Sequence, residues 1–332
     1  MNRERIWDVF NVDADGLLAR HQFRLAHPEP MENVTLVTGV KRDIALLARV
    51  VAALAATDAV ADGWKIHVFD ISFDRNADAV HSLLAAGAHI DYFDHHRAGL
   101  MQDHPQLHAR IDESPVSCSS LLVDRHCEGV HRQWAIAAAF GDNLSAIAQA
   151  MAREAGLAPV QAAQLQKLGE CLNYNAYGDS VSDLHYDPAH LAAQLQPYAD
   201  PFKFIDNEEI VSRLHAGYES DMAEACDVAA THESLRAAVY RLPDAAWSRR
   251  VSGAFANHLV HAFPQRAHAV ITADAAQRMT VSIRAPQHSP RDAATIATRF
   301  PGGGGRAAAA GIEAFEPGRL DELIAALEET YG

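Results

Sequence analysis

The sequence predicts an α/β protein. An N-terminal domain, with a mostly parallel sheet and helices on both faces, is followed by a helical connector and a smaller C-terminal α/β domain. Three observations support this fold class. Strand-like apolar runs alternate with helical apolar spacing in the first hundred residues, helical patterns then follow one another, and the tail returns to short strands and helices. We expect domains at 1–205 and 238–332, joined by residues 206–237.

Short apolar runs mark the strands of the first domain. They cover residues 6–12, 34–40, 65–69 and 89–93, and helical spacing follows the first three at 17–25, 43–56 and 76–86. Because parallel strands end at the same edge of a sheet, we expect a ligand site outside their carboxyl ends.

The middle of the chain is expected to be mainly helical and the tail mixed. Predicted helices cover 117–126, 133–140, 144–155 and 160–172, residues 173–200 are predicted to be loop, and 208–235 to hold one or two helices. In the tail we expect strands at 239–242, 269–272, 279–283 and 312–315, and helices at 254–262, 292–300 and 320–329.

The composition of the chain argues against several functional classes of protein. The net charge of −15, from 28 Lys and Arg against 43 Asp and Glu, argues against a protein that binds long duplex DNA. No apolar run reaches the roughly 18–20 residues of a membrane helix, and the charged start lacks the apolar region of a signal peptide. The four cysteines match no zinc spacing, so we expect reduced thiols in a cytoplasmic protein.

Acidic residues and histidines follow three of the predicted strands. Taken singly, each of these residues is a common helix cap or turn residue. Together at one sheet edge they would repel one another unless a cation were bound, and carboxylates with imidazole suit Mn²⁺, Mg²⁺ or Fe²⁺. Two ions roughly 4 Å apart would clamp a phosphoryl group. The set comprises Asp13, Asp15, Asp70, Asp94, His95 and His96, with Asp142 added from a break between two helices.

These residues resemble the motifs of the DHH phosphoesterases, in the subgroup with a C-terminal DHHA1 domain. Asp13-Ala14-Asp15-Gly16 resembles the first motif, Asp70 the second, Asp94-His95-His96 the third and Gly141-Asp142 the fourth. In the tail, Gly303-Gly304-Gly305-Arg306-Ala307-Ala308-Ala309-Ala310-Gly311 resembles the GGGHxxAAG signature of DHHA1, with Arg306 in place of the His. Val281-Ser282-Ile283-Arg284 resembles the substrate-contacting strand of that domain.

The resemblance implies a centre with two Mn²⁺ ions, Mg²⁺ being the alternative. It places Asp13 and Asp70 on one ion, and Asp15, Asp70, His95 and Asp142 on the other. It also implies that His96 faces the substrate phosphate, that Asp94 orients a neighbouring His, and that the active site is a cleft between the domains.

The resemblance also implies a substrate-binding set in the tail. Arg284, Arg306 and the backbone of Gly303, Gly304 and Gly305 would hold the far end of the substrate. The glycine run is a flexible loop or an anion cradle at a helix N-terminus, and the small residues after it favour the cradle. For Arg97 and the pair Lys41-Arg42, contact with a polyanion and simple solvation both stay open.

Two positions depart from the first motif. Many members of the family carry a His where this chain has Val9, and the RecJ-type exonucleases carry an acidic residue where it has Asn11. One metal site is therefore expected to be weaker, or to be completed by water.

The leading functional prediction is a Mn²⁺-dependent, exonuclease-like phosphodiesterase that uses two metal ions. It would convert short single-stranded oligonucleotides or small nucleotides to nucleoside monophosphates. The alternative activities are cyclic dinucleotide phosphodiesterase, 3′-phosphoadenosine-5′-phosphate phosphatase and exopolyphosphatase. From another class, Val9 and Asn11 favour a non-catalytic nucleotide-binding regulatory protein. No membrane partner is expected, and a homodimer stays open.

Overall fold

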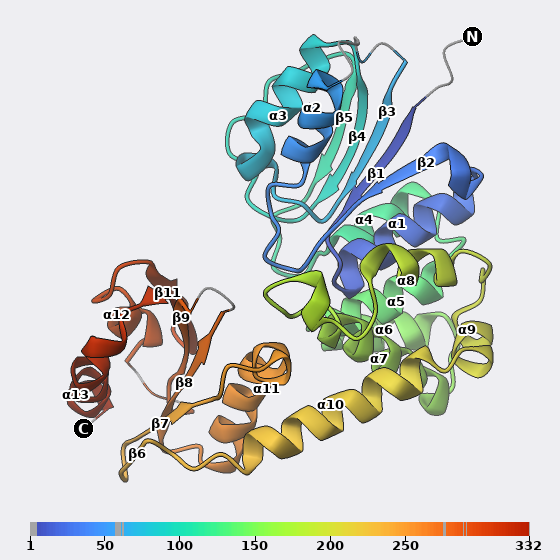
Figure 1. Cartoon of the computed structure of the whole chain (residues 1–332). Helices are drawn as coiled ribbons and strands as arrows, with labels where there is room; N and C mark the ends of the chain where they lie inside the picture. Colours follow the sequence, from blue (N-terminus) through green and yellow to red (C-terminus); the bar gives the residue numbers. More distant parts are fainter. Residues whose placement is uncertain are drawn as a thin grey trace. The chain divides into compact units, whose positions relative to one another are not determined.

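The chain forms two compact units in the computed structural model, Met1–His215 and Ala216–Gly332 (Figure 1). The division falls within helix α10 (Ile210–Cys226). The structure describes residues 5–56, 61, 63–274, 277–287, 289 and 291–331. Each unit has its own sheet and its own apolar core, so each is described by itself.

The first unit is built on a five-stranded parallel sheet with the order β2-β1-β3-β4-β5. Its strands are β1 (Ile6–Phe10), β2 (Val34–Val37), β3 (Lys65–Phe69), β4 (His89–Asp94) and β5 (Leu107–Ile111). From β1 the chain adds β2 on one side and β3, β4 and β5 on the other. The direction of winding therefore reverses between β1 and β3, which is where open α/β sheets bind ligands.

Helices cover both faces of this sheet, which confirms the predicted fold class. Helices α1 (Ala14–Ala26) and α4 (Ser119–His126) lie on one face, and α2 (Leu47–Ala55) and α3 (Phe73–Ala85) on the other (Figure 1). On the α1 face, the ring of Phe23 packs 5.4 Å from Phe69 and 5.8 Å from Phe93. Val9 belongs to the apolar cluster of the opposite face.

Further helices of the first unit follow α4 along the chain. They are α5 (Arg132–Gly141), α6 (Ser145–Glu154), α7 (Pro159–Tyr174), α8 (Pro188–Leu195) and α9 (Pro201–Asn207), with 3₁₀ turns at Met31–Asn33 and Val181–Asp183. Of these helices, α5, α7 and α8 contact α1, while α6 contacts α5 and α9 contacts α7. Helices α5 and α7 approach closely: a Cβ on Gly169 would lie 2.0 Å from the carbonyl oxygen of Ala137. A Cβ on Gly141 would lie 2.4 Å from the Cβ of Ala14. The end of α5, which carries Asp142, is therefore held against the start of α1.

The second unit is a six-stranded mixed sheet with the order β10-β11-β9-β8-β7-β6. Only β7 and β8 pair in parallel among the described strands of this sheet. The strands are β6 (His232–Glu233), β7 (Ala237–Arg241), β8 (Ala267–Ala273), β9 (Met279–Arg284), β10 (Gly303–Gly305) and β11 (Ala309–Phe315). The helices are α11 (Ala246–Ala262), α12 (Ala293–Ala297) and α13 (Leu320–Tyr331), with a 3₁₀ turn at Pro317–Arg319. Across the described part of the chain, no helix combines the length and apolarity needed to cross a bilayer.

Several predicted elements are wrong. Residues 173–200 are not all loop, because Asp187 caps α8 by accepting hydrogen bonds from the amides of Ala189 and His190. Strand β5 was not expected, since its half-polar sequence at the sheet edge lacks a continuous apolar run. The glycine run does not precede a helix: β10 pairs with β11 as an antiparallel hairpin, so the prediction of an anion cradle at a helix N-terminus is wrong.

Candidate metal centre

Asp13 and Asp15 lie where β1 passes into α1. Asp13 is the N-cap of α1, and its Oδ1 accepts a hydrogen bond from the amide of Gly16 at 3.0 Å. A Cβ on Gly16 would lie only 2.4 Å from the carbonyl oxygen of Asn11, so this tight turn requires glycine. The Asp15 carboxylate accepts hydrogen bonds from the amides of Ser119 and Ser120, both at 2.7 Å. Asp15 is therefore fixed by the free amides at the start of α4.

Asp70 follows β3 in a left-handed backbone conformation, with a φ of 58°. Asp tolerates this region better than most residues, and such conformations are frequent at functional sites. The Asp70 side chain is buried, and its Oδ1 accepts a hydrogen bond from the Ser119 hydroxyl at 3.2 Å. The same oxygen lies 3.2 Å from Nε2 of His95.

His95 Nε2 is the point on which the carboxylates converge. Besides Asp70, it lies 3.9 Å from Asp15 Oδ2 and 4.0 Å from Asp142 Oδ2. The structure thus brings together the four residues expected to share one ion, although they come from four separate segments of the first unit.

The charges in this cluster are not balanced by its own side chains. Burial and the negative charges of Asp13 and Asp15 raise the pKa of Asp70 well above its ordinary value. Burial and the same two carboxylates raise the pKa of Asp142 to about 7. Burial alone would lower the pKa of His95, but its contact with Asp70 and the charges of Asp15 and Asp142 raise it to about 10. A bound divalent cation would supply the missing positive charge, and carboxylate and imidazole donors fit Mn²⁺ or Mg²⁺.

Asp94 and His96 form a pair at the end of β4. Asp94 Oδ1 lies 2.7 Å from Nδ1 of His96, and it also accepts a hydrogen bond from the His96 amide at 3.2 Å. Its other oxygen accepts from the amide of Phe73 at 3.3 Å. Asp94 is fully buried, whereas the side chain of His96 is 45% exposed. A hydrogen bond from Nδ1 to Asp94 holds the His96 ring in one orientation.

Asp13 is placed differently from the other carboxylates. Its Oδ2 lies 2.5 Å from Nζ of Lys41, a residue that follows β2 at the same sheet edge. Burial opposes ionisation of Asp13, but the charge and hydrogen bond of Lys41 lower its pKa. Val9 is buried in the apolar core, and Asn11 Oδ1 accepts a hydrogen bond from the Asp13 amide at 3.4 Å.

The sequence did not reveal two of the groups that surround the cluster. Ser119 lies at the start of the helix predicted at 117–126, and its hydroxyl donates a hydrogen bond to Asp70. The cysteines were expected to be ordinary thiols, yet Cys118 Sγ and carboxylate oxygens of Asp15 and Asp142 lie within 4.8 Å of one another. Burial and those two carboxylates raise the pKa of Cys118 well above its ordinary value. The repeated Ser around Cys118, at the start of the helix expected at 117–126, was the signal that the sequence offered.

The residues expected to bind substrate from the tail lie at one end of the second sheet. Arg284 ends β9 opposite Ala309, and its Nε donates to Oδ1 of Asn257 at 2.7 Å. Gly305 pairs with Ala310, and the Arg306 amide donates to the carbonyl oxygen of Ala309 at 2.8 Å.

The three glycines of β10 occupy positions with different steric constraints. A Cβ on Gly303 would lie 1.8 Å from the carbonyl oxygen of Ala297, and Gly305 has a φ of 149°. A Cβ on Gly304 would meet no described atom within 4 Å, so packing does not require glycine there. Arg306 is exposed beside it. Arg97 is an exposed residue in the loop after β4 of the first unit.

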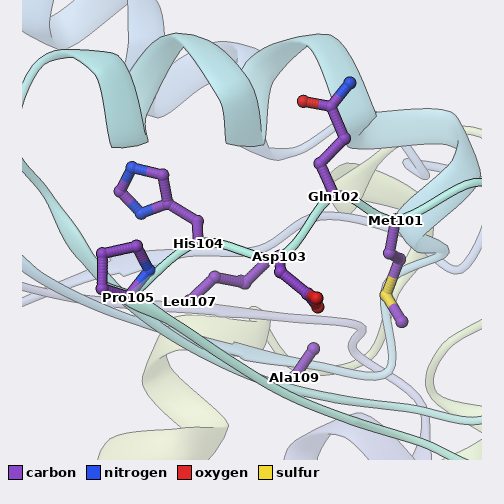
Figure 2. A pocket seen from close by; sticks show the side chains of 7 residues that line it. All are labelled: Met101, Gln102, Asp103, His104, Pro105, Leu107 and Ala109. Carbon is purple, nitrogen blue, oxygen red and sulfur yellow. The ribbon is translucent and has the colours of Figure 1, made fainter.

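A separate surface pocket of about 410 Å³ lies along the segment between β4 and β5 (Figure 2). It shares no residue with the carboxylate cluster, and we assign it no role. Its lining consists of Met101, Gln102, Asp103, His104, Pro105, Leu107 and Ala109.

The fold and the cluster define a class: a two-unit α/β protein with a candidate divalent-metal centre at the switch point of its parallel sheet. Residues 234–332 match the model of the DHHA1 domain family. The second unit therefore carries a DHHA1 domain, and the predicted resemblance to the DHH/DHHA1 family is confirmed. Comparison of the sequence with curated proteins found no match.

Solved structures share the fold along nearly the whole chain. The DHH domain of a member of a family of ribosomal proteins is 14% identical, with a TM-score of 0.65, and the match covers 98% of this chain and 86% of that one. The exonuclease RecJ bound to manganese is 16% identical, with a TM-score of 0.62 and coverages of 99% and 90%. A pGpG-specific phosphodiesterase from Vibrio cholerae is 12% identical, with a TM-score of 0.54 and a coverage of 98% of both chains.

Proposed function

We propose that this chain is a divalent-metal-dependent phosphodiesterase that releases nucleoside monophosphates from short single-stranded oligonucleotides or small nucleotides. One observation carries the proposal: carboxylate oxygens of Asp15, Asp70 and Asp142 converge within 3.2–4.0 Å of His95 Nε2. Mn²⁺ is the proposed ion, with Mg²⁺ as the alternative. The names of two structures with the same fold, an exonuclease bound to manganese and a pGpG-specific phosphodiesterase, support a phosphodiester substrate.

The residues of the first unit divide the chemistry between them. A divalent ion held by Asp15, Asp70, His95 and Asp142 would polarise a phosphoryl oxygen and lower the pKa of bound water. His96 presents Nε2 to the phosphate, where it stabilises developing negative charge or gives a proton to the leaving oxygen. Asp94 keeps the His96 ring in one orientation through its Nδ1 contact.

The second unit supplies the proposed contacts to the far end of the substrate. Guanidinium groups bind phosphate oxygens through paired hydrogen bonds, so Arg284 and the exposed Arg306 are suited to a second phosphate. The open space beside Gly304 leaves its backbone accessible to a ligand. The net charge of −15 disfavours long polyanions, which is why short substrates are proposed.

The second candidate is a nucleotide-binding regulatory protein without catalytic activity. It is favoured by the first motif, because Val9 is buried in the core and the Asn11 side chain binds the backbone. The complete set of Asp15, Asp70, His95 and Asp142 favours the enzyme.

A substrate panel with Mn²⁺ tests the proposal. It compares a linear dinucleotide, a longer single strand, a cyclic dinucleotide, 3′-phosphoadenosine-5′-phosphate and polyphosphate, with products separated by chromatography. We expect the linear dinucleotide to be hydrolysed fastest, to nucleoside monophosphates. Asp142→Asn should abolish the activity, and Asp206→Asn, at an exposed position, should retain it. Turnover of polyphosphate alone would refute the proposed substrate, and binding without turnover of any compound would favour the regulatory protein.

A further inference from the structure

Asp13 is the one carboxylate of the first motif whose charge is already neutralised. Its Oδ1 accepts from the Gly16 amide at 3.0 Å and its Oδ2 lies 2.5 Å from the Lys41 ammonium, so both oxygens have partners. The Asp13 side chain is only 3% exposed, so water contributes little to stabilising its charge. The Lys41 ammonium therefore balances the negative charge of Asp13, as a bound metal ion would otherwise do.

Lys41 is held in place by more than this contact. Its amide donates to the carbonyl oxygen of Ala176 at 3.0 Å, and its ammonium lies 5.5 Å from the centre of the Tyr177 ring. The side chain is 30% exposed, well below that of a solvated surface lysine. A cation–π contact and a buried carboxylate together fix the ammonium at the sheet edge.

Val9 and Asn11 add no further ligand to Asp13 and Asp70, so the charge of Lys41 decides whether a second ion binds there. Val9 is fully buried and belongs to the apolar cluster under α2 and α3. The Asn11 oxygen is engaged with the Asp13 amide at 3.4 Å. A divalent ion at Asp13 would also meet the Lys41 ammonium at short range, and like charges in a poorly solvated site repel strongly.

We propose that the Lys41 ammonium occupies the place of one of the two ions that the DHH resemblance implies, so that the chain binds a single divalent ion. That ion is held by Asp15, Asp70, His95 and Asp142, and Lys41 supplies a fixed positive charge next to it. This inference rests on the proposed function, since it assumes that the cluster binds a divalent metal.

Counting bound Mn²⁺ tests this proposal without any substrate. The full chain is stripped with chelator, titrated with Mn²⁺ by calorimetry, and examined by electron paramagnetic resonance. We expect about one Mn²⁺ per chain for the wild type, with the signal of an isolated ion. Lys41→Met removes the charge at similar size and should raise the count to about two, with the exchange-coupled signal of two neighbouring ions. Lys41→Arg keeps the charge and should stay at about one.

The matched control is Lys167→Met, at an exposed lysine of α7, which should behave as the wild type. Thermal unfolding of every variant shows whether it is folded. Two coupled ions in the wild type would overturn the proposal while leaving the proposed function intact. One ion in both the wild type and folded Lys41→Met would overturn it as well, because Lys41 would not be what excludes the second ion. No bound ion in the wild type would refute the proposed function together with this inference.

Discussion

A buried charged residue anchors the helix that carries the first motif. Asp8 on β1 is fully buried and accepts hydrogen bonds from Nε of Arg20 at 2.9 Å and from Nε of Arg24 at 2.8 Å. His67 on β3 lies 3.2 Å from the same carboxylate. Burial alone would raise the pKa of Asp8, but contacts with Arg24 and His67 and the charge of Arg20 lower it well below its ordinary value. Because Arg20 and Arg24 belong to α1, this network fixes the helix that begins at Asp13 and Asp15.

Asp8→Asn should destabilise the first unit strongly, because it leaves two buried guanidinium groups without a counterion. Removing one partner of a buried ion pair lowers the free energy of unfolding by about 3–5 kcal/mol, and unfolding in urea measures this loss. Because folding lowers the pKa of Asp8, the ionised carboxylate stabilises the folded state at pH values above the pKa of an Asp in the unfolded chain. This stabilisation is lost as the pH falls below that pKa towards the lower pKa of the folded state. The wild type should therefore lose stability in acid more steeply than the variant. A loss below about 1 kcal/mol would show that the network does not anchor α1.

At the residue scale, the sequence predicted the members of the cluster that end strands. Asp13, Asp70 and His95 follow apolar runs, and the edge of a parallel sheet brings such residues together. The ion pair of Lys41 with Asp13 could not be predicted, because a lysine after a strand is equally often solvated. The role of Ser119 also depends on how α4 packs against α1, which local sequence does not specify.

At the scale of elements, the crossing of α5 with α7 and α1 positions Asp142. A Cβ on Gly141 would lie 2.4 Å from Ala14 Cβ and 2.8 Å from the carbonyl oxygen of Gly169. The neighbouring atoms are backbone or a short side chain, so they cannot move aside without shifting a helix.

Gly141→Ala should therefore reduce both stability and metal binding. Overpacking costs about 1–3 kcal/mol, and the shift of α5 would carry Asp142 away from His95. Unfolding in urea and calorimetric Mn²⁺ titration measure the two effects. Gly253→Ala is the matched control, since Gly253 lies within α11 and a Cβ there meets nothing described within 4 Å. That change should be neutral or stabilise by up to about 1 kcal/mol. Unchanged Mn²⁺ affinity in Gly141→Ala would contradict the positioning of Asp142 by this crossing.

Element prediction succeeded where periodicity was strong and failed where it was weak. Strand β3 and most central helices follow clear apolar patterns, and they were predicted within a few residues of their bounds. Strand β5 has alternating polar residues at a sheet edge, and α8 begins at an Asp-Pro cap inside a polar segment. The glycine run was wrongly predicted to precede a helix, because small residues suit the start of a helix and a strand equally well. In the structure, pairing with β11 makes the run a strand.

At the scale of the whole molecule, the strong negative charge makes local cations important for binding. The chain carries −15 overall, so a phosphate substrate of the proposed enzyme would have to rely on the proposed metal centre and a few arginines. Arg306 is one of them, exposed at the end of the second sheet beside Gly304.

Arg306→Ala should raise the KM for a dinucleotide about tenfold, because a hydrogen bond to a charged group contributes about 1.5–3 kcal/mol. The same change should leave kcat/KM for bis-p-nitrophenyl phosphate nearly unaltered, since that small ester has no second phosphate. Steady-state kinetics with both substrates separate the two effects, with Arg236→Ala at an exposed position as control. Equal losses for both substrates would contradict a contact with the remote phosphate.

The most direct measurement is hydrolysis of bis-p-nitrophenyl phosphate with Mn²⁺ by the wild type and by Asp70→Asn. This activated diester needs no match to the second unit, so its turnover reports on the metal centre alone. Asp70 lies at the centre of the cluster, and metal stabilisation of the transition state amounts to several kcal/mol, so Asp70→Asn should lose at least about a hundredfold in kcat/KM. Chelator should abolish wild-type turnover, and added Mn²⁺ should restore it. Equal turnover by the wild type and a folded Asp70→Asn, or turnover that persists in chelator, would contradict a metal-dependent phosphodiesterase.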